Sequence, residues 1–306
     1  MICKTKHYFF DHQYEVYIEE GYILIGKQKD SIKYKIAFQN KMLIFWIFQQ
    51  GKFFGFKILL KEKWKQFDMN HENCLKLKNS LDGKIGYHKM DSLYKLLDTV
   101  GLGSYSEVLL IESYVDNKKY IAKKMAINSK NIVSFFNNEL YALQNLKHKN
   151  IIEMKEFYVG FADSYIIMNY IEGESLAKYM RYNKKICVKE IINILKQILE
   201  ALEYIHLNGF IHRDIKPENI LFERDHKFLT IIDFGFATKI EKQEYNAGTP
   251  GYIAPEVFEN VISTEKCDIF SLGCILYELQ SKQQLLECMV RNCFKEILLK
   301  RFSWQT

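Results

Sequence analysis

The sequence has little proline and no long apolar run. Its three prolines all lie between residues 217 and 255 of the 306-residue chain. Because proline fixes φ and removes a hydrogen-bond donor, this stretch predicts turns with demanding geometry. No apolar run approaches the roughly 18 residues that a membrane helix needs, and the run at 42–48 predicts a buried strand instead. We therefore expect no transmembrane segment.

Cysteine pairs and a leader are also missing. The seven cysteines, an odd number, contain no CxxC pair, which argues against structural disulfides and a structural zinc site. The opening MICKTKHYFFDH lacks the apolar stretch and the cleavage site of a signal peptide. These absences predict a cytoplasmic protein, with a nuclear or a peripheral membrane location as alternatives.

Arginine is absent from the first 95 residues, although the region is strongly basic. It carries 17 lysines and 10 acidic residues, a net charge of +7, whereas the remainder carries 26 basic and 27 acidic residues, a net charge of −1. Such a bias is typical of a solvated face, and it also attracts anionic surfaces such as lipid head groups. We expect lipid head groups as a candidate partner and no nucleic acid.

The pattern of the chain changes near residue 94. Residues 1–60 show patterns typical of strands, rich in aromatic and β-branched side chains. Residues 61–81, with Trp64, predict one helix, and 81–91 predicts a linker. Beyond residue 94, a strand, a glycine turn and a strand precede helical patterns at 134–146, 189–209 and 267–279.

Five motifs follow one another in the second region. They are GLGSYSEV at 101–108, a lysine-bearing strand followed by a glutamate-bearing helix, IIMNYI at 166–171, HRDIKPEN at 212–219, and DFG with GTPGYIAPE at 233–256. Each motif alone is weak, but the ordered set is specific. From about Tyr94 to about Leu279 the chain resembles the eukaryotic Ser/Thr protein kinases, nearest the calcium/calmodulin-dependent group. The resemblance implies ATP and Mg²⁺ as cofactors and protein serine or threonine as the substrate.

The resemblance assigns the chemistry to the last two motifs. Asp214 would accept the substrate hydroxyl proton, and Lys216 would neutralise the transferred phosphoryl group. Asn219 and Asp233 would hold Mg²⁺, which prefers oxygen ligands. Thr249 would bond Asp214 and Lys216 and shape the site for serine or threonine.

The nucleotide site is assigned in the same way, with one alternative left open. The strand length favours Lys123 as the phosphate-binding lysine, whereas the Ala-x-Lys spacing favours Lys124. Either lysine would pair with Glu139. The other residues implied for the ATP site are Gly101, Gly103, Ser106, Val108, the gatekeeper Met168, Asn169, Ile171 and Leu221.

The stretch 233–256 resembles an activation segment that ends at Glu256. Tyr245 occupies the position where many kinases carry a phosphorylated threonine, and Glu241 or Glu244 would supply the negative charge instead. Glu256 would need a late arginine, for which Arg291 and Arg301 are candidates.

These patterns predict an α+β chain. A β-rich domain at 1–85 resembles a pleckstrin-homology domain, and a bilobal kinase fold, with a shortened C-terminus, occupies 94–306. Its small lobe would span 94–170 and its large lobe 171–306. The alternative function is a pseudokinase or scaffold that uses the kinase fold for binding.

Overall fold

The structure is a computed structural model that describes most of the chain. The described residues are 1–5, 12–19, 21–38, 43–60, 62–103, 105–183, 186–225, 227–242, 248–258 and 263–281. They form two compact units. The first unit comprises Met1–Val133 and Glu153–Tyr170, and the second comprises Ser134–Ile152 and Ile171–Thr306.

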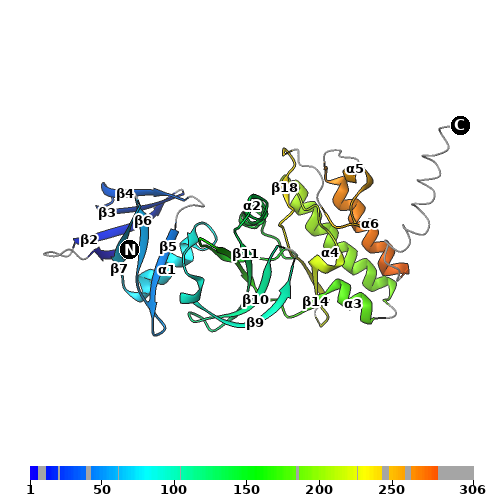
Figure 1. Ribbon diagram of the computed structural model, residues 1–306, viewed down its shortest axis with the longest axis horizontal. Helices are drawn as coiled ribbons and strands as arrows, with labels where there is room; N and C mark the ends of the chain where they lie inside the picture. Colours follow the sequence, from blue (N-terminus) through cyan, green and yellow to red (C-terminus); the bar gives the residue numbers. More distant parts are fainter. Residues whose placement is uncertain are drawn as a thin grey trace. The chain divides into compact units, whose positions relative to one another are not determined.

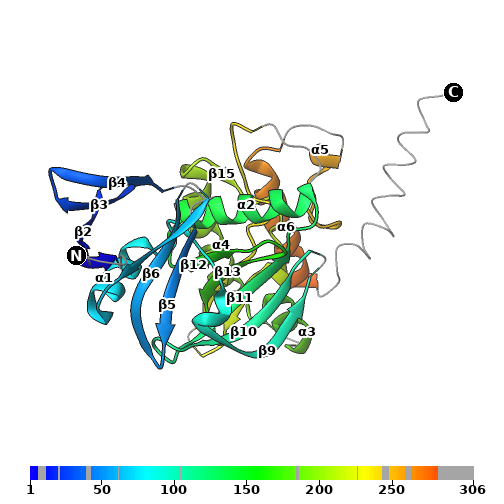
Figure 2. The same cartoon turned by 60° about the vertical axis from the view of Figure 1, so that its left-hand side comes forward.

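The first half of the first unit consists of seven strands and one helix (Figures 1 and 2). Neighbouring strands pair in antiparallel fashion, and β1 also pairs with β7. The helix α1 packs against β6, and it begins where the Asn70 side chain accepts a hydrogen bond from the Asn73 N–H at 2.9 Å. The elements are β1 (Ile2–Thr5), β2 (His12–Glu19), β3 (Tyr22–Gln28), β4 (Ser31–Ala37), β5 (Leu43–Gln49), β6 (Lys52–Leu60), β7 (Lys63–Asp68) and α1 (His71–Leu81).

Two sequence expectations for this region were wrong. The helix expected at 61–81 is a strand, β7, followed by the shorter α1, so Trp64 lies on a strand. The expected linker at 81–91 contains the short strand β8 (Gly86–Tyr87) and the turn η1 (Met90–Ser92). Tyr87 is fully buried, because β8 pairs in parallel with both β5 and β12.

The second half of the first unit is the strand region predicted from residue 94. Its five strands are β9 (Tyr94–Leu102), β10 (Glu107–Ser113), β11 (Lys119–Ala126), β12 (Met154–Val159) and β13 (Asp163–Asn169). Through β8 they join the N-terminal strands in one sheet of 13 strands, in the order β4-β3-β2-β1-β7-β6-β5-β8-β12-β13-β11-β10-β9. One hydrophobic core, with Trp46, Phe56 and Tyr158 among its members, extends through both halves.

A buried ion pair also joins the two halves of this unit. Lys78 of α1 pairs with Glu156 of β12, and both side chains are almost fully buried. The hydroxyls of Tyr94 and Tyr158 donate to Glu156 at 2.8 and 2.7 Å. Lys78 also lies 2.9 Å from Asp82. Burial and the neighbouring Glu156 carboxylate raise the pKa of Asp82 to about 7, whereas Lys78, despite burial, lowers the pKa of Glu156, so Glu156 is the carboxylate that stays ionised beside Lys78.

The second unit is mainly helical. Its longest helix, α4, buries residues spaced three or four apart, such as Ile191, Ile194 and Ile198. It runs beside α6, as Figure 1 shows, and ends before Gly209, whose φ of +76° suits glycine. The helices are α2 (Lys130–Asn145), most of which lies in this unit, α3 (Leu176–Tyr182), α4 (Val188–Leu207), α5 (Pro255–Phe258) and α6 (Lys266–Ser281).

Short strands of the second unit flank the loops and the turn that carry the motif residues. Two small sheets have the orders β14-β16-β17 and β15-β18. Their members are β14 (Glu174–Ser175), β15 (Phe210–Ile211), β16 (Ile220–Glu223), β17 (Phe228–Ile231) and β18 (Thr238–Lys239), with the turn η2 (Pro217–Asn219) before β16. The predicted α+β class, with a β-rich region before helices, is therefore confirmed.

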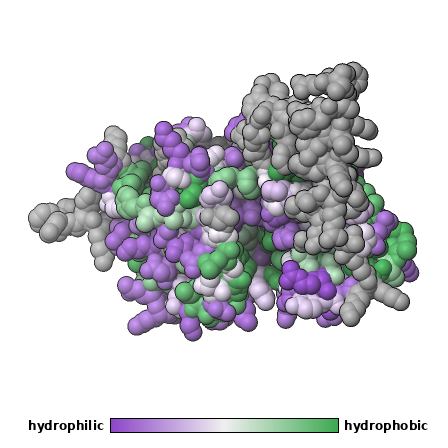
Figure 3. Space-filling model, turned by 45° about the vertical axis from the view of Figure 1, so that its right-hand side comes forward, coloured by the Kyte–Doolittle hydropathy of each residue, from purple (hydrophilic) through white to green (hydrophobic). Residues whose placement is uncertain are grey.

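Hydrophilic and hydrophobic residues are both present on the surface of the protein. On the face shown in Figure 3, hydrophilic residues predominate and hydrophobic residues form separate, smaller patches. Among the residues that the structure describes, no helix is long and apolar enough to cross a membrane.

Candidate active site

Asp214 is the centre of a hydrogen-bonded network in the second unit. Its carboxylate accepts a bond from the Thr249 hydroxyl at 2.6 Å and lies 2.8 Å from the Lys216 ammonium. Lys216 also donates to the Thr249 hydroxyl at 2.6 Å. The Asn219 amide donates to the Asp214 carboxylate at 2.8 Å and to its backbone oxygen at 2.9 Å. The arrangement fixes one carboxylate and one cation side by side.

A second carboxylate, Asp268, holds the loop that carries this network. It is fully buried at the start of α6 and accepts the backbone N–H groups of His212 and Arg213 at 2.9 and 2.8 Å. Arg213 has a φ of +67°, which is unusual for a residue with a side chain. The two hydrogen bonds that Asp268 accepts compensate for this strained backbone. His206 adds a third contact to Asp268 at 2.8 Å.

His212 packs inside the same loop. Its ring lies edge-on to Phe234 of the DFG motif, with centroids 4.7 Å apart. Burial lowers the pKa of His212, so the ring is neutral near pH 7. Its Nδ1 therefore accepts the Asp214 N–H at 3.3 Å.

Asp233 and Asn219 are brought together through the backbone. The Ile232 N–H, next to Asp233, donates to the Asn219 backbone oxygen at 2.9 Å. Both amide hydrogens of Asn219 are used by Asp214, so its side-chain oxygen remains as an acceptor. That oxygen and the Asp233 carboxylate are ligands that a hard divalent cation prefers. The donor set thus fits a metal that also binds phosphate oxygens.

Glu139 lies near the DFG turn. It is fully buried on α2, and a Cβ built on Gly235 would be 3.9 Å from its Oε2 and 3.3 Å from Oδ1 of Asp233. Phe135 of the same helix packs on Phe236, with ring centroids 5.0 Å apart. The lysine expected to pair with Glu139 belongs to the first unit, so this ion pair stays a prediction.

The glycine turn lies in the first unit. Gly101 is opposite Val108 in the pairing of β9 with β10, and the Gly103 N–H donates to the Ser106 backbone oxygen at 2.7 Å. A Cβ at Gly103 would lie 3.2 Å from the Ser106 hydroxyl. Ser106 therefore fits inside the turn at the position where a third glycine was expected.

The two candidate lysines have different surroundings on β11. Lys123 is opposite Val108 of β10 and is buried. Lys124 is partly exposed and forms ion pairs with Glu107 at 3.2 Å and Asp163 at 3.8 Å. Only Lys123 thus lies opposite the valine of the glycine motif.

The expected adenine-side residues occupy the end of β13 and the neighbouring segments. Met168 is buried between β11 and β12, opposite Ile121 and Met154. The Asn169 backbone N–H donates to the Glu153 backbone oxygen at 3.1 Å. Of the Asn169 backbone groups, the carbonyl is therefore the one that could accept a hydrogen bond from adenine. Ile171 and Leu221 belong to the second unit, where Leu221 is partly buried on β16.

The segment after DFG is bonded to the loop at 212–216 and to the strand before it. β18 pairs with β15 in antiparallel fashion, and Nε of Arg213 donates to the Phe236 oxygen at 2.8 Å. Glu256 is partly buried on α5 and has no ion-pair partner within the described ranges. Tyr245 and Glu244, and the candidate partners of Glu256, lie outside the described residues.

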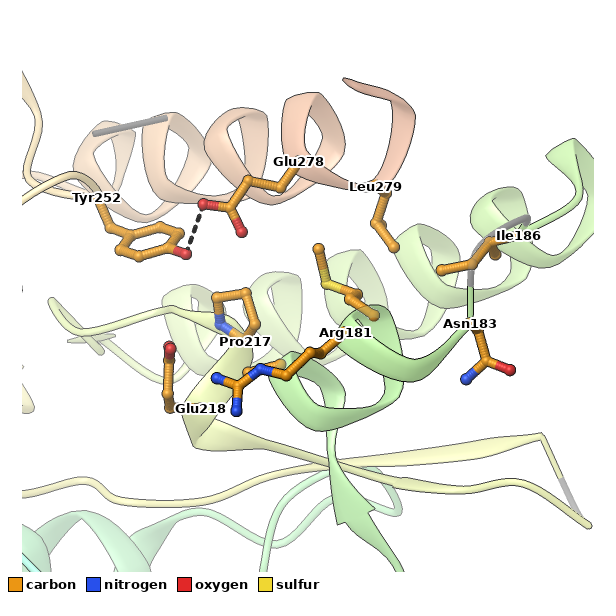
Figure 4. A pocket seen from close by; sticks show the side chains of 10 residues that line it. Arg181, Asn183, Ile186, Pro217, Glu218, Tyr252, Glu278 and Leu279 are labelled. Atoms are coloured by element: carbon orange, nitrogen blue, oxygen red, sulfur yellow. Dashed lines mark hydrogen bonds between the residues drawn. The ribbon is translucent and has the colours of Figure 1, made fainter. Parts of the chain in front are cut away.

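Sequence reasoning missed a pocket beside the turn η2, lined by both polar and apolar side chains. It has a volume of about 210 Å³ and is lined by Glu218, Tyr252, Glu278 and Arg181, among others (Figure 4). The Tyr252 hydroxyl donates to Glu278 at 2.7 Å. Glu218 and Tyr252 lie inside the motifs HRDIKPEN and GTPGYIAPE, so the sequence offered a signal for these two residues. Glu278 and Arg181 lie outside every recognised motif, so nothing in the sequence indicated them.

Comparisons with known proteins agree with the geometry. The model of the protein kinase domain matches residues 94–303. The chain is 34% identical over 218 residues to the serine/threonine-protein kinase Nek1 of Mus musculus, covering 69% of this chain and 18% of that protein. It is 37% identical over 222 residues to the calcium-dependent protein kinase 6 of Plasmodium berghei (69% and 14%), and 34% over 219 residues to the serine/threonine-protein kinase cds1 of Schizosaccharomyces pombe (66% and 47%). The chain thus spans less than half the length of these relatives.

Proposed function

Since the chain belongs to the protein kinase family, as the match over residues 94–303 shows, we propose that it transfers the γ-phosphoryl group of ATP to serine or threonine hydroxyls of proteins. The observation that carries the proposal is the network of Asp214, Lys216, Asn219 and Thr249. A scaffold that only binds nucleotide would not need a carboxylate and a lysine fixed against each other.

In this proposal Asp214 accepts the hydroxyl proton of the substrate. The Asn219 amide and the Thr249 hydroxyl orient the carboxylate so that it needs no rearrangement. Lys216 neutralises charge on the transferred group, and its bond to Thr249 keeps it beside Asp214. Because Thr249 occupies this position, the site favours the short side chains of serine and threonine.

Asp233 and the Asn219 side-chain oxygen would hold the divalent metal, which we propose to be Mg²⁺. When bound, the metal supplies charge neutralisation for the phosphate oxygens of ATP. In the first unit, we propose that Gly101, Gly103 and Ser106 present backbone N–H groups to phosphates. The burial of Lys123, and its position opposite Val108, support Lys123 over Lys124 as the phosphate-binding lysine.

The decisive test is the substitution Asp214→Asn. We expect purified chain with Mg-ATP to phosphorylate a generic basic protein, and the variant to lose this activity by at least about 10²-fold because the proton acceptor is removed. Asp225→Asn is the matched control, because Asp225 is an exposed carboxylate in the turn between β16 and β17. Equal phosphate incorporation by wild type and the Asp214 variant would contradict the proposal.

The rival proposal, a pseudokinase or scaffold, is distinguished by nucleotide binding and turnover together. Nucleotide at 100 times its Kd stabilises the folded state by about 2.7 kcal/mol. Stabilisation by Mg-ATP without phosphoryl transfer would favour the pseudokinase. The absence of both stabilisation and phosphoryl transfer would favour the scaffold.

Finer assignments are also proposals. The sequence GTPGYIAPE and the calcium-dependent relative support the calcium/calmodulin-dependent group, although the two other relatives are almost equally similar. Seven strands followed by one helix support a pleckstrin-homology-like N-terminal domain, and its net charge of +7 supports anionic lipid head groups as partners. The boundaries 1–85 and 94–306 and a cytoplasmic location stay predictions.

A further inference from the structure

An apolar groove lies along α4 and the first turn of α6. It has a volume of about 880 Å³, and both helices belong to the second unit. The side chains of Ile192, Leu199, Leu207 and Ile269 line the groove, and these residues are between 47% and 81% exposed. Large apolar side chains that gather on one surface mark a site of interaction, because water disfavours their exposure.

Acidic side chains border this groove. Glu200, Glu203 and Glu265 line it, together with one lysine, Lys196. Glu200 forms ion pairs with Lys149 and Lys196, whereas Glu203 and Glu265 form no ion pair with the residues that the structure describes. The groove therefore suits an amphipathic helix that presents one apolar face and carries basic residues beside it.

The sequence has a segment of this kind directly after α6. Residues 282–306, which lie outside the described ranges, follow Ser281 at the end of that helix. Apolar residues recur there at spacings of three or four, which predicts a helix with one apolar face. The segment has five basic and two acidic residues, a net charge of +3. The residues of the predicted apolar face are Leu286, Met289, Val290, Cys293, Phe294 and Ile297.

The segment is also long enough to reach the groove. Ile269 lies twelve residues before the end of α6, which is about 18 Å along the helix at a rise of about 1.5 Å per residue. A helix over 286–297 has the same length, and residues 282–285 would form a connection of ordinary size between two helices. A helix that returned antiparallel to α6 would therefore extend to the level of Ile269.

We propose that residues 282–306 dock in the groove of α4 and α6 of the same chain. The predicted apolar face would cover Leu199 and Ile269 and so remove their exposed surface from water. The basic residues of the segment would lie beside Glu203 and Glu265, and the opposite charges favour the same arrangement. The proposal does not depend on phosphoryl transfer.

The docked segment would also cover the support of the loop at 212–216. His206 lines the groove, and its Nε2 lies 2.8 Å from the Asp268 carboxylate. Asp268 in turn accepts the backbone N–H groups of His212 and Arg213. Because hydrogen bonds strengthen where water is excluded, the docked segment would hold this loop more firmly without contacting the proposed catalytic residues.

The test is disulfide trapping in the full chain. Leu199→Cys places a thiol in the groove, and oxidation can join it to Cys288 or Cys293 only where the Cα atoms come within about 7 Å. Ile269→Cys repeats the test from α6. Leu96→Cys is the matched control, because Leu96 is an exposed leucine of β9 in the first unit. Mass spectrometry of the digested, non-reduced protein identifies the joined peptides, and gel mobility distinguishes intramolecular from intermolecular disulfides.

Two further substitutions, each combined with Leu199→Cys, test which face of the segment docks. Phe294→Glu places a carboxylate on the predicted apolar face. Asn292→Glu adds the same charge on the opposite face of the predicted helix, two residues away, and serves as its control. Only the first substitution should disturb an apolar contact with the groove.

We expect at least one of the two groove variants to form the intramolecular disulfide with a yield at least about fivefold above that of Leu96→Cys. Phe294→Glu should lower the yield from Leu199→Cys by at least about fivefold, because a carboxylate is costly to bury among apolar side chains. Asn292→Glu should change this yield by less than about twofold. Disulfides that join two chains would assign the groove to a second copy and overturn the proposal. Equal yields in the groove and control variants, or equal effects of the two glutamates, would also overturn it.

Discussion

Lys123 and Lys124 are adjacent residues whose side chains lie on opposite faces of β11. Side chains alternate along a strand, so only one of them shares a face with Val108. Sequence alone left the choice open, because the hairpin length and the Ala-x-Lys spacing favoured different lysines. Only the pairing register of β10 with β11 separates the two.

This difference predicts opposite outcomes for two single substitutions. Lys123→Met should lower kcat/KM for ATP by about 10²-fold or more, because a preorganised positive charge on the phosphates is lost. Lys124→Met should change it by less than about threefold, because it removes only surface ion pairs worth about 0.2–1 kcal/mol. Steady-state kinetics, with melting curves to confirm folding, check both. A larger loss in the Lys124 variant would reverse the assignment.

The residues that we propose as catalytic are the easiest to identify from the sequence. Asp214, Lys216 and Asn219 lie within one octapeptide, whose local turn places them together. The support from Asp268 arrives from α6, more than fifty positions further along the chain. Local motifs therefore identify candidates, whereas hydrogen bonds to a distant helix hold the loop that carries them.

At the scale of elements, α1 and β12 meet through the pair of Lys78 and Glu156. The pair is enclosed by hydroxyls of Tyr94 and Tyr158. Removing one partner of a buried pair leaves the other charge without compensation, which costs about 3–5 kcal/mol. The helix α1 thus contributes to the stability of a kinase strand, although it lies before the family match.

Lys78→Met should therefore lower the free energy of unfolding by about 3–5 kcal/mol, as measured by urea denaturation. Lys76→Met serves as the control on the same helix, since among the described residues Lys76 forms an ion pair with the exposed Glu72 alone. This substitution should change the free energy of unfolding by less than about 1 kcal/mol. Similar effects of the two substitutions would show that the buried pair does not join the elements.

At the scale of the molecule, the 13-stranded sheet continues across residues 86–93, where the sequence suggested a boundary between two domains. Aromatic strands before residue 60 and kinase motifs after residue 94 were visible as patterns. The joining element, β8, has only two residues, too few for any periodicity. Its pairing with β5 and β12 is set by contacts distant in sequence, which a single sequence does not display.

A chain that begins at residue 94 should consequently fold poorly. It would expose the edge of β12 and leave Glu156 without Lys78, at a cost of several kcal/mol. Circular dichroism and thermal melting of residues 94–306, beside the full chain, measure this effect. If the truncated chain melts at the same temperature as the full chain, residues 94–306 form an independently folding domain and this prediction is wrong.

The two-residue strand β8 also bears on how this protein could have been assembled. A domain that is joined by a linker can be exchanged between genes, because its neighbours do not depend on it. Here a cut between residues 85 and 94 would divide one sheet and one core. Recombination that separated the N-terminal region from the five kinase strands would therefore divide this sheet and this core between two genes.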